Sequence, residues 1–372
     1  MQRNFLRIAQ ACLEHGHEVH VYALEWQGER PSRLKLTLLR IKTWLKHQRG
    51  SAFAHAAAEE IAKHDYDAVI GFNRMPGLDV YYAADPCFVA RAQKQRGKLY
   101  RLSARYRDFA ALEKAVFAPE SGTEILVLSE VEKANFIRHY GTPAERFHLL
   151  PPEIATDRFA SSDAPLIRAG LRAEFGIAPS EKLLVLIGSG FKTKGLDRAL
   201  LALASLPTEL RSRTRLIAIG QDNPRPFLRL ARRLKLSRQV SILPGRDDIP
   251  RFLQGADLLI HPAYAENTGT ILIEAMAAGL PVLTTDACGY SPHVERAGAG
   301  YVLASPFDQS ELDSRLAEML MSDQHRHWHD EGIRYAASLR NFSRTTIAME
   351  VIETRAIKNA EQRREVVFAR AD

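Results

Sequence analysis

The feature that most constrains the fold is a regular alternation of short apolar runs and helical patterns in the second half of the sequence. Apolar runs with the length of a buried strand lie at 182–187, 215–219, 240–243, 257–260 and 281–285. Helical patterns lie at 196–206, 226–236, 249–255 and 268–278, and only helices are expected after the last run. Strands that alternate with helices of this length form a parallel sheet with helices on both faces. This half is therefore predicted to be a doubly wound α/β domain.

The first half alternates in the same way but begins with a helix, at 3–14, which Gly16 ends. The strands expected after it lie at 17–24, 34–41, 68–71, 78–83 and 124–129, with a short one that ends at Leu150, and helices are expected at 53–64 and 131–139. A doubly wound domain normally begins with a strand in the middle of its sheet. Either this domain lacks that strand or its true start lies further upstream.

A boundary between two domains is marked by Pro151-Pro152 and the polar Ser161-Ser162-Asp163 that follows. A chain of 372 residues is also long for a single core. We expect domains at 1–155 and 156–340 and a basic C-terminal helix at 341–372. Two doubly wound domains enclose a cleft, and ligands bind beyond the carboxyl ends of the strands.

The composition is that of a soluble globular protein, with 46% hydrophobic and 26% charged residues. No uncharged apolar run reaches the ~18 residues that span a bilayer. Arg7 interrupts the only apolar stretch that could serve as a signal peptide. Cys12, Cys87 and Cys288 lie far apart and form no CxxC pair. We therefore expect a reduced, cytoplasmic compartment.

The net charge of +7 is concentrated between residues 88 and 117, where eight basic residues stand against two acidic ones. Apolar side chains recur there at helical spacing: Leu99, Leu102, Tyr106, Phe109 and Val116. A cationic row lies beside them: Lys94, Lys98, Arg101 and Arg105. Such a helix suits an anionic membrane surface, or else its apolar row faces the core and its charges are solvated. A nucleic-acid partner is less favoured, because helix-turn-helix, RNP-like and zinc-finger patterns are lacking.

Two carboxylates flank the start of the helix expected at 268–278. Glu266 lies in the loop before it, and Glu274 is the only charge in the apolar stretch 271–278. A helix that is apolar on nearly every side is buried, and a buried carboxylate is costly unless something pairs with it. The alternative is a helix cap followed by an ordinary helical glutamate.

A glycine-rich turn with two lysines, Lys192 and Lys194, joins the first strand of the second domain to its helix. The glycines that let the backbone approach an anion are Gly188, Gly190 and Gly195. The spacing fits neither a dinucleotide fingerprint nor a P-loop, and a tight turn with solvated lysines is the alternative. Because this turn and the start of the 268–278 helix share one sheet edge, a diphosphate could bridge them. The segment 245–249, with Arg246, offers backbone groups to a nucleobase or simply begins a helix.

The spacing Glu266-x7-Glu274 and the lysine turn resemble those of retaining GT-B glycosyltransferases of family 4, the EX7E type. Four further segments resemble the lipopolysaccharide core glucosyltransferases within that family: 71–85, 99–102, 220–222 and 261–264. The resemblance extends from Gln2 to about Tyr335. It implies two Rossmann-like domains and transfer of glucose from UDP-glucose to a lipid-anchored heptose at the cytoplasmic face of the inner membrane.

The resemblance also implies roles for the donor-side residues. Glu274 accepts the ribose hydroxyls of UDP-glucose, and Glu266 holds hydroxyls of the glucose. The backbone amides of Thr268, Gly269 and Thr270 bind the diphosphate, and Lys192 and Lys194 neutralise it as it leaves. The acceptor attacks on the face from which the phosphate departs, so no protein nucleophile, metal ion or cofactor is expected.

On the acceptor side, the resemblance places Asp85 near the reacting sugar, although Asp85 before Pro86 also suits a simple turn. Asn4, Asn73 and Arg74 are expected to contact the acceptor. Two features depart from the family: its first strand and Gly-Gly loop are absent, with Asn4 in place of its aspartate, and Glu153 replaces a glycine. A protein that binds UDP-sugar without turnover is therefore one alternative, and a basic membrane- or nucleic-acid-binding module is another.

Three other groups of polar residues were weighed as metal sites. Asp65-Tyr66-Asp67 precedes a strand rather than following one, which argues against a metal-binding DxD motif. The histidines at 15 and 17, and those at 325, 327 and 329, have no cysteine or carboxylate at suitable spacing. We expect these histidines to be solvated. The sequence carries no signal of an oligomeric state.

Overall fold

The computed structural model describes residues 2–368, without the side chains of residues 2, 3, 95 and 366–368. The chain forms two compact units, one from Met1–Pro151 together with Ser343–Asp372 and the other from Pro152–Phe342. The division therefore lies slightly before the boundary expected at 155. The C-terminal segment, which we expected as a separate part from 341, belongs to the first unit.

A six-stranded parallel sheet, in the order β12-β11-β10-β7-β8-β9, forms the centre of the second unit. Its strands are β7 (Lys182–Ile187), β8 (Thr214–Ile219), β9 (Val240–Leu243), β10 (Leu258–His261), β11 (Val282–Thr285) and β12 (Gly300–Leu303). Strand β12 was not expected, because we predicted only helices after residue 285. Four residues with a glycine at the first position give too short an apolar run to distinguish from a loop.

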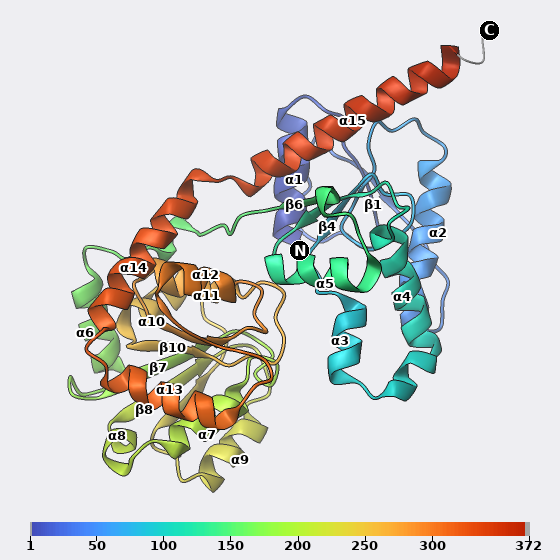
Figure 1. Cartoon of the computed structure of the whole chain (residues 1–372). Helices are drawn as coiled ribbons and strands as arrows, with labels where there is room; N and C mark the ends of the chain where they lie inside the picture. The colour runs from blue at the N-terminus through green and yellow to red at the C-terminus, as the bar shows by residue number, and fades with distance from the viewer. Residues whose placement is uncertain (1, 369–372) are drawn as a thin grey trace. The chain divides into compact units, whose positions relative to one another are not determined.

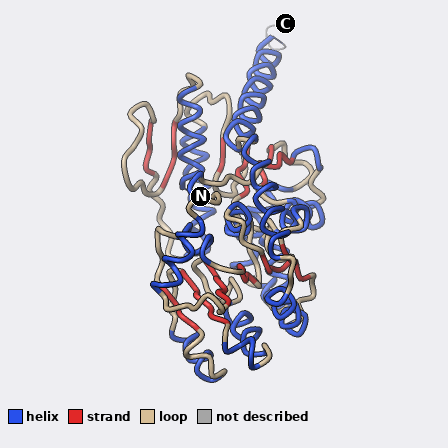
Figure 2. The backbone as a smooth tube through the Cα atoms, turned by 90° about the vertical axis from the view of Figure 1, so that its left-hand side faces the viewer, coloured by secondary structure: helices blue, strands red, loops and turns tan. Residues whose placement is uncertain are grey.

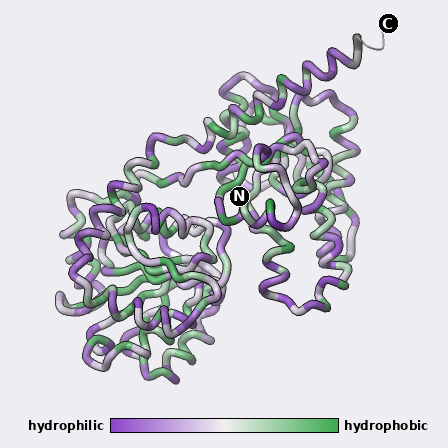
Figure 3. The backbone as a smooth tube through the Cα atoms, in the orientation of Figure 1, coloured by the Kyte–Doolittle hydropathy of each residue, from purple (hydrophilic) through white to green (hydrophobic). Residues whose placement is uncertain are grey.

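Helices cover both faces of this sheet, as Figure 2 shows in blue around the red strands. They are α6 (Ala164–Glu174), α7 (Leu196–Ser205), α8 (Thr208–Ser212), α9 (Arg225–Arg233), α10 (Ile249–Gly255), α11 (Thr270–Ala277), α12 (Ser291–Ala297), α13 (Gln309–Met321) and α14 (His325–Ser338). Alternate residues of β7 enter different cores: Leu183 and Val185 pack on one face, Leu184 and Leu186 on the other. The strands therefore form the hydrophobic centre that is green in Figure 3, as expected for a parallel sheet.

The first unit holds two separate parallel sheets among its described residues, β1-β2 and β3-β4-β5-β6. The strands are β1 (His20–Ala23), β2 (Lys35–Leu38), β3 (Ile70–Gly71), β4 (Val80–Ala83), β5 (Glu124–Val127) and β6 (Phe147–Leu149). In a doubly wound sheet the first strand lies between the second and the fourth. The strands in the second and fourth positions, β1 and β3, are each at the edge of a separate sheet here.

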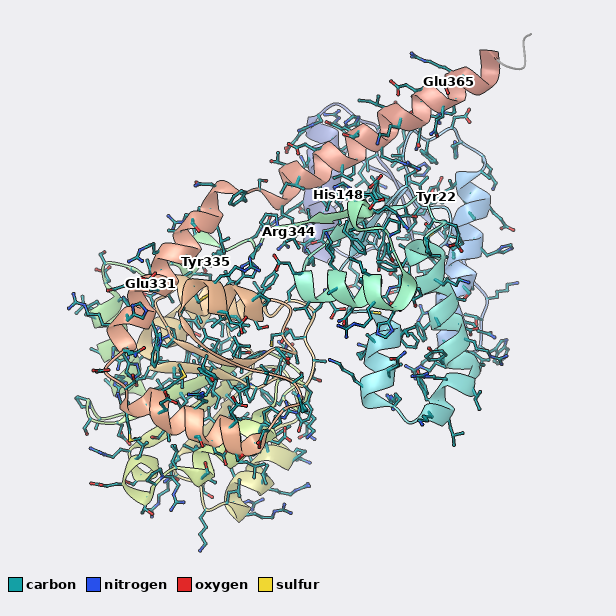
Figure 4. The ribbon with its side chains drawn as sticks, in the orientation of Figure 1. Tyr22, His148, Glu331, Tyr335, Arg344 and Glu365 are labelled. Atoms are coloured by element: carbon teal, nitrogen blue, oxygen red, sulfur yellow. The ribbon has the colours of Figure 1, made fainter. Side chains whose placement is uncertain are left out.

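The helices of the first unit include the C-terminal one, α15, which Figure 1 shows in red along the blue helix α1. The helices are α1 (Gln2–Glu14), α2 (Arg49–Ile61), α3 (Phe88–Gln95), α4 (Ala104–Phe117), α5 (Glu130–Tyr140) and α15 (Arg344–Phe368). Arg344, labelled in Figure 4, donates from Nε and Nη2 to the carbonyl of Pro151 at 3.1 and 3.0 Å. Ala348, Met349 and Ile352 then enter a core shared with α1 and β4. The last residues, 369–372, lie outside the described part.

The basic segment is not one helix, contrary to our prediction. It consists of α3, a 3₁₀ turn at Lys98–Leu102 and α4, whose first turn is capped by the Ser103 hydroxyl. Arg96 and Gly97 are both extended, so the helical pattern stops between α3 and the 3₁₀ turn. The apolar row is divided accordingly: Leu99 and Leu102 are 81% and 76% exposed, whereas Val116 is fully buried.

No helix among the described residues is long and apolar enough to cross a membrane. The sequence led to the same expectation.

Candidate active site

The site lies at the carboxyl ends of β7 and β10, which are neighbours in the second unit's sheet. The chain continues from β7 to β8 on one side and returns through β10 to the other side. In open α/β sheets, ligands bind where the strand order reverses in this way, because the loops leave in opposite directions and open a crevice. The two stretches selected from the sequence, 188–195 and 266–274, follow these two strands.

The glycine-rich turn after β7 is fixed tightly against the loop after β10. Gly195 has a φ of +80°, and a Cβ there would lie 2.0 Å from the carbonyl oxygen of Pro262. Only glycine fits this conformation and this approach. Asp222 also holds the turn, since its Oδ2 accepts from the amide of Phe191 at 2.8 Å. The segment 220–222, which contributed to the family resemblance, therefore supports the turn.

Lys194 of this turn forms a close ion pair with Glu266. The other oxygen of Glu266, Oε2, lies 2.9 Å from Nε2 of the fully buried His261. Burial raises the pKa of Glu266, but the hydrogen bond from His261 and the charge of Lys194 outweigh it and hold the pKa at about 2. Glu266 is therefore an ionised acceptor at neutral pH. Its neighbour Lys194 is one of the two lysines that the sequence predicted at this site.

Glu274 lies on α11 with a side chain 20% exposed, less buried than the apolar pattern suggested. Burial still raises its pKa, and the charge of Arg158 opposes this shift only in part. The ion pair between the two is long, 3.8 Å from Nε to Oε2. Among the described residues, Nε and Nη1 of Arg158 are buried without a hydrogen-bond partner. This corner of the site therefore has unused hydrogen-bonding capacity that a polar ligand could fill.

The N-terminus of α11 directly follows the loop that carries Glu266. Gly269 precedes the helix with a φ of +79°, so Thr268, Gly269 and Thr270 form the turn at its start. The amides of a first helical turn lack intrahelical acceptors and carry a partial positive charge, so they bind anions. The carbonyl of Thr268 accepts from the amide of Tyr290 at 2.7 Å, which holds this turn in place.

Two predicted donor-side residues have their side chains engaged elsewhere. Lys192 bonds Asp197 at 2.5 Å and Tyr264 at 2.9 Å and is 67% exposed. Arg246 forms a two-pronged pair with Asp248 at 2.7 and 2.8 Å, just before α10. Lys192 is thus partly neutralised, and the backbone of 245–247 rather than the Arg246 side chain is left for a nucleobase.

His261, Glu266 and Cys288 offer ligand atoms within 4.8 Å of one another. Each oxygen of Glu266 has one partner, His261 for Oε2 and Lys194 for Oε1. Burial raises the pKa of the Cys288 thiol to about 12, so it is protonated at neutral pH. Lys194 already supplies a cation to the carboxylate of this group, so a metal ion there would have to displace that ammonium group.

In the first unit, Asp85 is exposed just after β4, where the sequence placed it. Arg74, which we expected to contact the acceptor, has its guanidinium engaged by protein groups. Its Nη1 pairs with the fully buried Glu113 at 3.0 Å, and its Nη2 donates to the carbonyls of Asp85 and Pro86 at 3.2 and 2.8 Å. Arg74 therefore fixes the turn that carries Asp85, and Asn73 beside it remains exposed.

Glu113 and Glu132, which sequence reasoning missed, hold the other end of this turn. Glu113 accepts from the amides of Phe88 and Val89 at 2.7 and 3.1 Å, and Glu132 accepts from the amide of Cys87 at 2.7 Å. Both carboxylates thus bind the first amides of α3. In the sequence, Glu113 was counted only as one of two acidic residues in the basic segment. Its isolated position among basic residues was the one sequence signal that it has a specific partner. Asn4, on α1, donates to the hydroxyl of Tyr82 at 2.7 Å.

Comparisons with known proteins agree with this arrangement. Residues 168–334 match the family described as "Glycosyl transferases group 1" and residues 1–158 match "Glycosyltransferase Family 4". The chain is 40% identical to the lipopolysaccharide glucosyltransferase WaaG of Escherichia coli (strain K12), over 95% of this chain and 94% of that protein. The crystal structure of WaaG, described as a glycosyltransferase involved in lipopolysaccharide biosynthesis, superimposes with a TM-score of 0.83, covering 94% of this chain and 95% of that one.

A more distant similarity concerns the fold alone. Anabaena HepE in complex with UDP-glucose is 18% identical with a TM-score of 0.66, over 91% of this chain and 99% of that one. Fold and site together define a glycosyltransferase of the GT-B type, with parallel sheets in two Rossmann-like units. Within that class, the chain belongs to the family of the lipopolysaccharide glucosyltransferase WaaG. The family that the sequence resembled is thereby confirmed.

Proposed function

We propose that this protein transfers glucose, with retention of configuration, from UDP-glucose to an inner-core heptose of lipopolysaccharide at the cytoplasmic face of the inner membrane. The coarser activity, that of a hexosyltransferase of lipopolysaccharide biosynthesis, follows from the family. The observation that carries the finer proposal is the group at the start of α11. There an ionised glutamate pairs with a lysine in the loops next to a helix N-terminus, and a second glutamate lies on the same helix.

The donor fits this group by charge and hydrogen bonding. The first amides of α11 and the ammonium of Lys194 bind the diphosphate, whose charge they oppose. Glu266 accepts hydroxyls of the glucose while His261 fixes its orientation. Glu274 and Arg158 bind the ribose, which supplies the hydroxyl partners that this corner lacks.

The reaction then requires the bond between C1 of the glucose and the diphosphate oxygen to break while the acceptor hydroxyl attacks C1 from the same face. The departing phosphate oxygen takes the acceptor proton, so atoms and charge balance without a protein nucleophile. Lys194 and the helix N-terminus stabilise the charge that develops on the leaving group. A bound metal ion stabilises the leaving group in this way in other enzymes. We therefore propose that this protein needs no metal ion for the transfer. Asp85 is the acidic residue of the first unit that we assign to this reaction.

The acceptor is a sugar on a lipid, and the 3₁₀ turn between α3 and α4 suits a membrane that holds it. Leu99 and Leu102 are strongly exposed there. The basic residues Lys94, Lys98, Arg101 and Arg105 are exposed on the same short segment. Exposed leucines flanked by basic side chains favour the surface of an anionic membrane, where each basic residue contributes about 1 kcal/mol. Figure 1 shows this turn at the end of the α3–α4 pair, away from the sheets of its unit.

Glu274→Ala tests the donor assignment. Removing a charged acceptor of two hydroxyls should weaken UDP binding by about 2 kcal/mol or more, at least about thirtyfold, in isothermal titration calorimetry. Glu295→Ala, an exposed change on α12, is the control and should leave the affinity unchanged. Equal affinity of wild type and Glu274→Ala for UDP would contradict the assignment. Tight UDP binding without acceptor-dependent release of UDP would instead indicate a donor-binding protein without turnover.

A further inference from the structure

A cluster of metal-ligating side chains lies in the first unit, apart from the residues assigned to sugar transfer. Nδ1 of His15 and Nε2 of His17 lie 2.8 and 3.0 Å from the same oxygen, Oε1 of Glu353. The three ligand atoms are all within 4.8 Å of one another. Both histidines are exposed, as expected, but they share a carboxylate partner that was not expected. Their carboxylate partner is 338 positions away from His15 along the chain, so no spacing pattern reveals it.

The end of α1 brings the two histidines to one point. Gly16 lies between them with a φ of +89°, in the left-handed region that glycine adopts readily. The amide of Gly16 donates to the carbonyl of Leu13 at 3.2 Å, and the amide of His17 donates to that of Cys12 at 2.9 Å. These two bonds form a Schellman motif, which ends the helix and fixes the residues on either side of the glycine.

The carboxylate is held by equally firm packing. Glu353 lies one turn after Met349 on α15, next to the buried Ile352. Met349 is 2% exposed, and its sulfur lies 3.5 Å from the buried sulfur of Cys12 on α1. Figure 1 shows these two helices side by side. The backbone on both sides of the cluster is thus fixed by helix and core, so little ordering remains for a ligand to bring about.

We propose that His15, His17 and Glu353 bind a Zn²⁺ ion that joins the end of α1 to the C-terminal helix α15. Two imidazoles and one carboxylate are a ligand set that Zn²⁺ favours, with the fourth position open to water. Bond lengths of 2.0–2.2 Å in a tetrahedron separate ligand atoms by about 3.4 Å. The two ring nitrogens lie 2.8 and 3.0 Å from Oε1 of Glu353, a few tenths of an ångström closer than this, because one carboxylate oxygen now accepts from both rings. The two nitrogens are within 4.8 Å of each other, so small side-chain rotations bring all three atoms to the tetrahedral spacing.

The ligand types also select the ion. Ca²⁺ and Mg²⁺ require mostly oxygen ligands, whereas imidazole suits Zn²⁺ and its neighbours in the transition series. The three side chains are 51%, 45% and 35% exposed, so an ion can enter and a water can complete the coordination. The site lies in the first unit, whereas the donor-binding residues are in the second. Its predicted effect is therefore on the attachment of α15 rather than on donor binding.

Calorimetric titration of the full chain with ZnCl₂ alone tests this site, together with a thermal melt. Wild type should bind one Zn²⁺ per chain, and Zn²⁺ should raise its melting temperature because the ion binds only the folded junction. His17→Gln and Glu353→Gln should each weaken binding at least tenfold and remove the thermal shift. His148→Gln is the matched control, since His148 pairs with Glu124 at 2.8 Å but has no second histidine.

X-ray absorption at the zinc edge gives a second readout that does not depend on stability. Wild type should show two imidazoles and oxygen ligands, and His17→Gln should lose one imidazole. The proposal is overturned if wild type shows no saturable binding, or if His17→Gln binds Zn²⁺ like wild type. It is also overturned if His148→Gln weakens binding as much as His17→Gln, which would mean adventitious binding to surface histidines.

Discussion

At the scale of single residues, the site depends on how neighbouring charges act on two glutamates of the same segment. Glu266 has a lysine and a histidine as partners, and these hold its pKa far below the usual range despite burial. Glu274 has one distant arginine, and burial raises its pKa. Glu266 is therefore a firmly ionised acceptor, whereas Glu274 has room to bind ligand hydroxyls.

The lowered pKa of Glu266 predicts a pH-dependent contribution to stability. The pKa falls from 4.5 to about 2 on folding, so the stabilisation is fully present above pH 4.5 and is lost as the pH falls towards 2. The shift corresponds to an order of magnitude of about 3 kcal/mol. In urea unfolding, Glu266→Gln should be less stable than wild type at pH 6, and the difference should shrink as the pH approaches 2.

The control for this experiment is Glu295→Gln, an exposed change in the same unit. It should follow the wild-type curve at every pH. A stability difference between wild type and Glu266→Gln that persists unchanged down to pH 2 would contradict the ionised pairing of Glu266 with Lys194 and His261.

Glu113 should be essential for the stability of the first unit. It is fully buried and pairs with Arg74, whose side chain is only 12% exposed. Removing one partner leaves a buried charge without compensation, at a cost of about 3–5 kcal/mol. Glu113→Gln should therefore lower the urea midpoint strongly, whereas Glu120→Gln, exposed in the turn after α4, should not. A loss below about 1 kcal/mol would show that Arg74 finds other partners.

At the scale of elements, the loops after β7 and β10 form the site because the strand order reverses between these strands. The sequence was sufficient for this part. The bounds of β7, β9 and α10 are those that the apolar runs predicted, since buried strands of a parallel sheet are continuous apolar runs with helices between them. The glycine turn could be located because its glycines are needed where the backbone approaches a neighbour.

The basic segment shows where sequence reasoning failed. Helical spacing joined Leu99 to Val116, but Gly97 and Ser103 divide the segment into α3, a 3₁₀ turn and α4. Arg74 was assigned to the acceptor, and its pairing with Glu113 could not be seen because the two are brought together only by the tertiary fold. Periodicity describes one element at a time, whereas such pairings depend on how elements pack.

The 3₁₀ turn should determine membrane binding. Replacing Leu99 and Leu102 by serine, or Lys94 and Lys98 by glutamate, should reduce sedimentation with vesicles of anionic phospholipid about tenfold or more. The matched control is Leu166→Ser, because Leu166 is also strongly exposed, at 74%, but lies in the second unit. The Lys94/Lys98 variant should also lose the salt dependence of binding. Unchanged binding in both variants would place the membrane contact elsewhere.

At the scale of the whole molecule, the two units divide the work. The second carries every residue assigned to the nucleotide sugar, and the first carries Asp85, the basic segment and the C-terminal helix. The sequence could not show that α15 packs on the first unit, because its partners on α1 lie at the opposite end of the chain. In both units, residues assigned to the reaction lie in segments that follow the carboxyl ends of strands: β7 and β10 in the second unit and β4 in the first.

The most direct test is the transfer reaction itself, with UDP-glucose and purified lipopolysaccharide core that ends in inner-core heptose. Mass spectrometry should show the acceptor heavier by one hexose, and NMR of the product should show an α-linkage, the configuration of the donor. Glu274→Ala should give no product under the same conditions. An acceptor that remains unchanged while wild type binds UDP-glucose tightly, or a product with the β-linkage, would contradict the proposed reaction.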